Sequence, residues 1–146
     1  MSQAVQTGCS GYSRSVRSLA AAIALVVLFS LSACSSGNDD AATQAAEQLH
    51  ASLRTEDGSA ACALLSDAVQ EELSESQGSS CESAVMAAGI PDSGRVVEVK
   101  VYGTSALVRY DEDVVFLGEF PDGWKVTAAG CSPHAGAPYD CQVQGG

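Results

Sequence analysis

The spacing of apolar residues changes near the middle of the chain, and this change limits the possible fold more than any other feature. Between Val97 and Ala128, apolar and polar residues alternate, which is the period of a half-buried β-strand. The alternation is interrupted by short turns at 103–104, 111–113 and 121–123. Because such short turns join antiparallel neighbours, the pattern predicts a meander of four antiparallel strands.

Upstream of Gly94, apolar residues recur every three or four positions, which is the spacing of amphipathic helices. A first helix is predicted to begin at Asp39 or Asp40 and to end near Arg54. Shorter helices follow it and end by Gly89. The expected fold class is α+β, with about three short helices packed on one face of the four-stranded sheet.

The first 33 residues form a different kind of segment. Residues 1–17 are polar and contain two arginines and no acidic residue, and Leu19–Phe29 is an unbroken run of 11 apolar residues. A membrane-spanning helix needs about 20 such residues, so this run has the length of the apolar part of a secretory signal peptide. We therefore divide the chain into a signal peptide, a polar tether and a single domain, at residues 1–33, 34–41 and 42–146.

The quartet Leu31-Ser32-Ala33-Cys34 follows the apolar run and resembles the lipobox of bacterial lipoprotein precursors. The resemblance implies that Cys34 is thioether-linked to diacylglycerol and that the chain is cut just before it. The protein is then expected at the extracytoplasmic face of the cell membrane, held by two or three acyl chains that each contribute about 0.8 kcal/mol per buried CH₂. The alternative is an ordinary cleaved signal in which Cys34 stands by chance.

The chain is strongly acidic. Its net charge is −11, and removal of residues 1–33, which contain two arginines and no acidic residue, lowers it to −13. Nucleic acid is not an expected partner, because phosphate contacts need clustered lysine and arginine. An anionic membrane surface would also repel the domain, so we expect the lipid at Cys34 to be what binds the membrane.

Four cysteines remain in the predicted domain, at positions 62, 81, 131 and 141. An even number in a small exported domain indicates two disulfides, for which three pairings are possible. We favour Cys62–Cys81 and Cys131–Cys141, because local closures require the least organisation of the chain. A zinc site is the alternative, but the spacing of these cysteines is unlike that of paired C-x₂-C ligands.

Four features resemble a group of small actinobacterial lipoproteins: Cys62-Ala63-Leu64-Leu65-Ser66, Cys81 with a short helix, residues 122–131, and Pro138-Tyr139-Asp140-Cys141. Within them, Gly123-Trp124-Lys125-Val126 is similar to the closing strand of domains with a nuclear-transport-factor-2-like cone. That likeness implies helices covering a curved sheet, here in a reduced form with four strands. It implies a fold and no particular activity.

A cone of this kind suggests a cavity, for which His50 is the first candidate residue. His50 lies beside Leu49 at the edge of the apolar stripe of the first predicted helix. It could act as a base or a ligand at the mouth of the cone, with a carboxylate such as Glu119 as its partner. The alternative is a side chain at the boundary of the core, with no chemical role.

The third and fourth predicted strands hold the other candidates. Val114, Phe116 and Phe120 share one face of the third strand, whereas Glu119 points inward or outward according to the register. Trp124 follows a turn and either belongs to a binding face or covers the end of the core, and we favour the second.

Other signs of chemistry are weak. The chain contains no nucleophile elbow, P-loop, H-E-x-x-H or dinucleotide fingerprint. Residues 111–113, Asp-Glu-Asp, could bind Ca²⁺, but a solvated hairpin turn is the simpler interpretation. Ser132, His134 and Asp140 include the residue types of a catalytic triad but lie in a Gly/Pro-rich loop. We therefore expect no catalytic residue, no metal ligand and no cofactor.

Two classes of function remain. The first is a non-catalytic accessory or binding module of the cell envelope, and the second is a small-ligand carrier or enzyme that uses the cone. Cavity volume distinguishes them: a filled interior would exclude a carrier. A pocket of about 300 Å³ or more with His50 facing a carboxylate would weaken the accessory interpretation.

Overall fold

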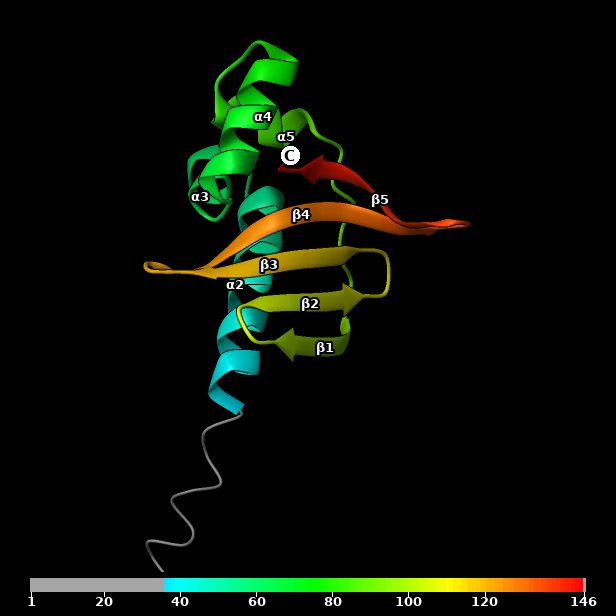
Figure 1. Cartoon of the computed structure of the whole chain (residues 1–146). Coiled ribbons are helices and arrows are strands. Elements are labelled where there is room, and N and C mark those ends of the chain that lie inside the picture. The colour runs from blue at the N-terminus through cyan, green and yellow to red at the C-terminus, as the bar shows by residue number, and fades with distance from the viewer. Residues whose placement is uncertain (1–35, 146) are drawn as a thin grey trace, which may run out of the picture. The chain divides into compact units, whose positions relative to one another are not determined.

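The structure is a computed structural model that describes residues 36–145. Helices come first in this range: α2 (Ser36–Arg54), α3 (Gly58–Ala63), α4 (Asp67–Gln77) and α5 (Cys81–Ala87). The strands follow: β1 (Val96–Tyr102), β2 (Ser105–Tyr110), β3 (Val114–Phe120), β4 (Gly123–His134) and β5 (Ala137–Gln144). They form one antiparallel sheet in chain order, with the helices on one face (Figure 1).

The α+β class and the meander are therefore confirmed, and the described residues add a strand and a helix to the prediction. The additional helix arises because the chain is interrupted between α3 and α4, where Ser66 is the N-cap residue of α4 and makes no side-chain capping bond. The additional strand is β5, and it pairs with the outer half of β4.

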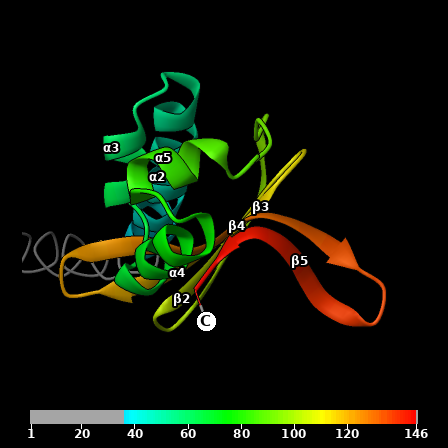
Figure 2. The same ribbon diagram turned by 90° about the horizontal axis from the view of Figure 1, so that it is seen from above.

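β5 was missed because its surroundings contain residues that usually interrupt strands. Pro133 lies where the β4–β5 register shifts between Ser132 and His134, and such irregularities are positions where a sheet tolerates proline. Gly130 has a positive φ of 67°, and a Cβ there would lie only 2.7 Å from the side chain of Gln142. The glycine thus permits the strong bend with which the β4–β5 hairpin leaves the body of the domain (Figure 2).

Helix α2 crosses the strands and supplies the centre of the core (Figure 1). Ala42, Ala46 and Leu49 form its inner face, and all three are fully buried. Alanine on this face lets the helix axis approach the sheet closely. The opposing fully buried residues come from strands β2, β3 and β4: Val108, Val115 and Val126.

The face of β3 that Val114, Phe116 and Phe120 share is not the face that packs on the helices. Val115 and Leu117 face the helices and are buried. Phe116 is half-buried and Phe120 is exposed, because both belong to the face that the helices do not cover. Phe116 instead stacks edge-on with Tyr139 of β5, with a distance of 5.0 Å between ring centroids.

The predicted tether lies partly within the described residues. Residues 36–41 form the first turns of α2, and residues 37–41 are exposed. The predicted signal peptide and Cys34 lie outside the described residues. None of the helices within 36–145 combines the length and the apolar character needed to cross a membrane.

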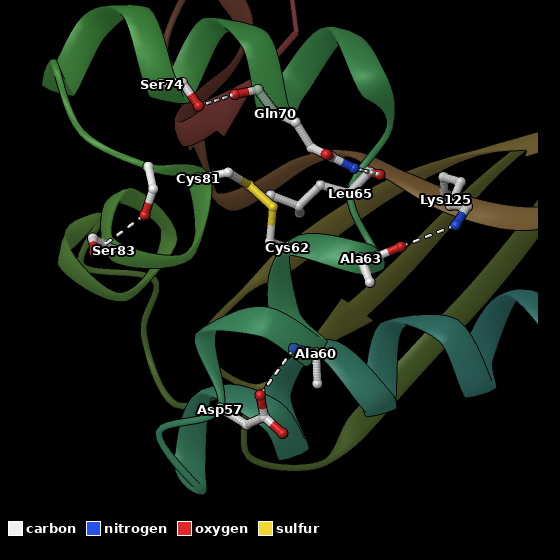
Figure 3. Close-up of a disulfide and its surroundings, with 11 residues drawn as sticks. Asp57, Ala60, Cys62, Ala63, Leu65, Gln70, Ser74, Cys81, Ser83 and Lys125 are labelled. Carbon is white, nitrogen blue, oxygen red and sulfur yellow. Dashed lines mark hydrogen bonds between the residues drawn. A yellow bond between two sulfur atoms is a disulfide. The ribbon is translucent and has the colours of Figure 1, made fainter.

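Both predicted disulfides are present. Cys62–Cys81 joins α3 to α5 (Figure 3), and a Cβ on Gly58 would collide with the backbone carbonyl of Glu82, so the two helices lie very close together. Cys131 and Cys141 stand directly opposite each other on β4 and β5, with their Cα atoms 4.0 Å apart. The first bridge holds the helices together, and the second holds the hairpin.

The helical half is also bonded to the edge of the sheet. Ser66 donates its backbone N–H to the carbonyl of Val126, and Val126 donates in return to Leu64, both at 2.9 Å. Lys125 adds a hydrogen bond from Nζ to the carbonyl of Ala63, also at 2.9 Å (Figure 3). The part of β4 that β5 does not pair with is thereby covered.

Replacing Cys62 and Cys81 together by alanine is expected to lower the free energy of unfolding by about 3 kcal/mol, because the bridge closes a short loop in the unfolded chain. Urea denaturation of the purified protein measures this loss, and the Cys131→Ala/Cys141→Ala pair is the matched variant, with a similar expected loss. Thiol titration of the denatured, unreduced protein provides the check. Reaction of all four cysteines would contradict both bridges.

Candidate functional site

The most unusual feature of the interior is a histidine beside a carboxylate. His50 follows the fully buried Leu49 on α2, and its side chain is only 2% exposed. Its Nε2 lies 3.2 Å from Oδ2 of Asp113, whose side chain is completely buried. A buried carboxylate is costly unless it is paired, so the two side chains stabilise each other's position.

Asp113 is held in place by the sheet. Its Oδ1 accepts a hydrogen bond from the backbone N–H of Cys131 at 2.9 Å, and its carbonyl accepts one from the N–H of Tyr110 at 2.8 Å. These bonds fix the β2–β3 turn and leave Oδ2 directed toward His50. The turn itself is as predicted, with Asp111 and Glu112 exposed, but Asp113 is buried rather than solvated.

Tyr110 completes the cluster. Its ring meets the imidazole of His50 edge to face, with centroids 4.8 Å apart, and the residue is only 4% exposed. Burial raises the pKa of its hydroxyl well above the ordinary value, and the negative charges of Glu47 and Asp113 raise it further. The hydroxyl therefore keeps its proton over the whole physiological range and can donate a hydrogen bond.

Three polar atoms of this cluster have no hydrogen-bond partner among the described residues: His50 Nε2, Tyr110 Oη and Asp113 Oδ2. The Nε2–Oδ2 distance is short, but the two atoms are not aligned for a hydrogen bond. Buried polar atoms in folded proteins almost always have a hydrogen-bond partner, so three such atoms on neighbouring side chains are unusual for a protein core. We call His50, Tyr110 and Asp113 the polar cluster.

A cavity of about 630 Å³ borders the polar cluster and is open to solvent. One wall is α2 and the other is the segment leading into β1, with Tyr110 between them. Its lining residues are Gln44, Glu47, Gln48, His50, Ala51, Arg54, Ser93, Gly94, Arg95, Val96 and Tyr110. A smaller cavity of about 200 Å³ shares His50 and Arg54 with it and is closed by residues 90–92.

The candidates named from the sequence are not all brought together. His50 lines the cavity, but the carboxylate that faces it is Asp113 and not Glu119. Glu119 is exposed and pairs with Trp124 next to the β3–β4 turn, at the opposite end of β3 from the polar cluster. Trp124 is buried in the core, as favoured above, and neither residue lines these two cavities.

Ser132, His134 and Asp140 lie on the projecting β4–β5 hairpin. All three are exposed, so they do not form a buried triad. Within residues 36–145 no group of three or more histidine, cysteine and acidic side chains is arranged to hold a metal ion.

Sequence reasoning missed three residues of the site: Asp113, Tyr110 and Ser93. A usable signal existed for Asp113, because it is two residues before Val115 and therefore shares the inner face of the strand. Ser93 offers no such signal: it is a buried serine in an irregular segment between α5 and β1.

Comparison of the chain with protein-family models, with curated proteins and with solved structures finds no match.

The raised pKa of Tyr110 predicts a specific loss of stability at alkaline pH. Above pH 10 the unfolded chain releases the Tyr110 proton while the folded chain keeps it, so stability falls as the pH rises. Between pH 8 and pH 11 this one group is expected to cost about 1.4 kcal/mol. Urea unfolding at both pH values measures the loss, which Tyr110→Phe should remove.

Tyr102→Phe is the matched control, because Tyr102 is 69% exposed and should leave the alkaline loss as in the wild type. Equal alkaline losses in the wild type and in Tyr110→Phe would show that Tyr110 is free to ionise in the folded protein.

Proposed function

We propose that this protein is a membrane-anchored extracytoplasmic lipoprotein whose domain binds a small molecule in the cavity beside His50. The observation that carries the binding function is the polar cluster: its three buried polar atoms make no hydrogen bond among the described residues, and two of its residues, His50 and Tyr110, line a cavity of about 630 Å³. Small-molecule sites have this character: a concave surface with a few well-placed polar groups.

The cavity favours binding over a purely structural accessory role. It exceeds the 300 Å³ set as the criterion for a ligand site, and His50 faces a carboxylate beside it. A domain that serves only as a spacer or scaffold gains nothing from a buried charge beside an open cavity. The carrier interpretation of the sequence is therefore the one that the geometry supports.

Binding is also favoured over catalysis. Ser93 lines the same cavity as His50, and with Asp113 it would provide the residue types of a serine hydrolase. No hydrogen bond joins Ser93 to His50 in the part of the chain that the structure describes, and the histidine is not aligned with Asp113. Nucleophilic catalysis depends on both contacts, so we assign recognition to this cluster.

The anchor is supported by the quartet ending at Cys34 and by the segments before it. Because α2 begins only two residues later, at Ser36, a lipid on Cys34 would keep the domain near the bilayer through a short connection. The negative charge of the domain opposes direct contact with anionic headgroups, so attachment depends on the acyl chains.

Cys34→Ala is expected to abolish lipid attachment and to shift the protein from the detergent phase to the aqueous phase in a cloud-point partition of bacterial membranes. Cys9→Ala is the matched control and should leave partitioning unchanged, because Cys9 lies in the removed segment. A Cys34→Ala protein that stays in the detergent phase and is still cleaved before residue 34 would contradict the anchor.

The binding function predicts that the protein carries a small molecule when it is purified from its membrane. Mass spectrometry of the extracted small molecules should reveal at least one compound that is enriched with the wild type and lost with His50→Gln. The glutamine amide can still reach Asp113, so this variant should keep its fold, which circular dichroism checks. His134→Gln alters an exposed histidine and should retain the compound.

A set of extracted compounds that is the same for the wild type and for a folded His50→Gln variant would rule out binding beside His50.

A further inference from the structure

The charge of the cavity wall is opposite to that of the protein. Residues 34–146 have a net charge of −13 and contain only five basic residues. Two of these, Arg54 and Arg95, line the cavity, whereas Glu47 is its single acidic lining residue. Two of the five basic residues of this acidic domain thus lie at one cavity.

We propose that the cavity takes a small organic carboxylate, whose anionic group lies between Arg54 and Arg95. This inference rests on the proposed binding function and specifies its ligand class. The planar guanidinium group suits a carboxylate because it can donate two parallel hydrogen bonds to it.

The present partners of both arginines are weak and can be exchanged. Arg54 lies 3.6 Å from Asp92, and Arg95 lies 3.7 Å from Asp111. Both guanidinium groups are more than half exposed, and exposed pairs at such distances contribute little to stability. A ligand carboxylate can therefore replace either contact at small cost.

The backbone positions of the two arginines are nevertheless fixed. Arg54 belongs to the last turn of α2, where a positive charge is favoured by the helix dipole. The backbone N–H of Arg95 donates to Oδ2 of Asp111 at 3.2 Å, and its carbonyl accepts from the N–H of Asp111 at 3.1 Å. The walls that carry the charges are thus preorganised, and only the side chains have to move.

The rest of the cavity suits the body of such a molecule. Ala51, Val96 and the ring of Tyr110 provide apolar surface, and the Tyr110 hydroxyl and His50 provide polar contacts at its inner end. A ring of benzoate size can be accommodated in 630 Å³. We therefore choose 4-fluorobenzoate as the probe, with neutral 4-fluorobenzamide as its closest uncharged analogue.

A cationic ligand is the opposite possibility, since Glu47 and the carboxylates of Asp92 and Asp111 lie near the cavity. The two acids outside the lining already face arginines, which leaves Glu47 as the one unpaired acid in the wall. The balance of lining charges favours an anion, and 4-fluorobenzylamine tests the alternative directly.

The experiment measures dissociation constants of the three probes by ¹⁹F NMR, using the full mature protein in detergent micelles and protein-free micelles as the blank. Arg54→Gln and Arg95→Gln are compared with Arg109→Gln, in which an arginine paired with Glu98 on the other face of the sheet is changed. The benzoate is expected to bind more tightly than the benzamide. Each cavity variant should raise the benzoate dissociation constant about three- to fivefold, whereas Arg109→Gln should leave it unchanged.

The outcomes separate the two proposals. Equal binding of benzoate and benzamide, tighter binding of the benzylamine, or a benzoate preference that survives both cavity variants would overturn the carboxylate inference while keeping a binding cavity. Failure of all three probes to bind, together with no compound lost in His50→Gln, would overturn both proposals. A benzoate preference that disappears in Arg54→Gln and Arg95→Gln supports the inference.

Discussion

The burial of one face of α2 against the sheet is the interaction on which the rest of the structure depends. Ala42, Ala46 and Leu49 are fully buried, and the small alanines bring the helix close to the strands. Because His50 directly follows Leu49, the imidazole is carried into the same interior. A polar ring at that depth needs a polar neighbour, and Asp113 provides it. Core packing and the polar cluster are therefore consequences of the same helix–sheet contact.

The Cys131–Cys141 disulfide and the hydrogen bonds of β4 connect the polar cluster to the rest of the domain. The Cys131–Cys141 bridge fixes the hairpin exactly where the backbone N–H of Cys131 bonds to Asp113. The bridge therefore supports the position of the carboxylate as well as the hairpin. At the other side of β4, the bonds between Leu64, Ser66 and Val126 hold the helical half on the sheet. An open cavity is tolerated between α2 and the segment before β1 because the surrounding elements are tied together at these points.

Much of the fold could be predicted from the sequence, because it depends on local periodicity. The stripe of Ala42, Ala46 and Leu49 predicts a helix, and the alternation after Gly94 predicts a meander. The observed disulfide pairs were favoured among three possible pairings because they close short loops. β5 was not predicted because proline and glycine, here Pro133 and Gly130, are unfavourable in strands. The sheet accommodates these two residues at a bulge and at a bend. Whether such residues end a strand or only bend it depends on the neighbouring strand with which it pairs, and the local sequence does not show that pairing.

The polar cluster was only half predictable for a related reason. His50 is evident from its position on the apolar stripe, but its partner is 63 positions away and depends on which face of β3 turns inward. If the face with Val114, Phe116 and Phe120 is taken as the inner face of β3, Asp113 points to solvent. In the structure the inner face is that of Val115 and Leu117, and Asp113 on the same face points to His50. Because side chains alternate strictly along a strand, one choice of face decides whether an acidic turn is a solvated loop or half of a site. The partner of a buried histidine on a helix is therefore best predicted by finding the acidic residue that lies on the inner face of the strands on which the helix packs.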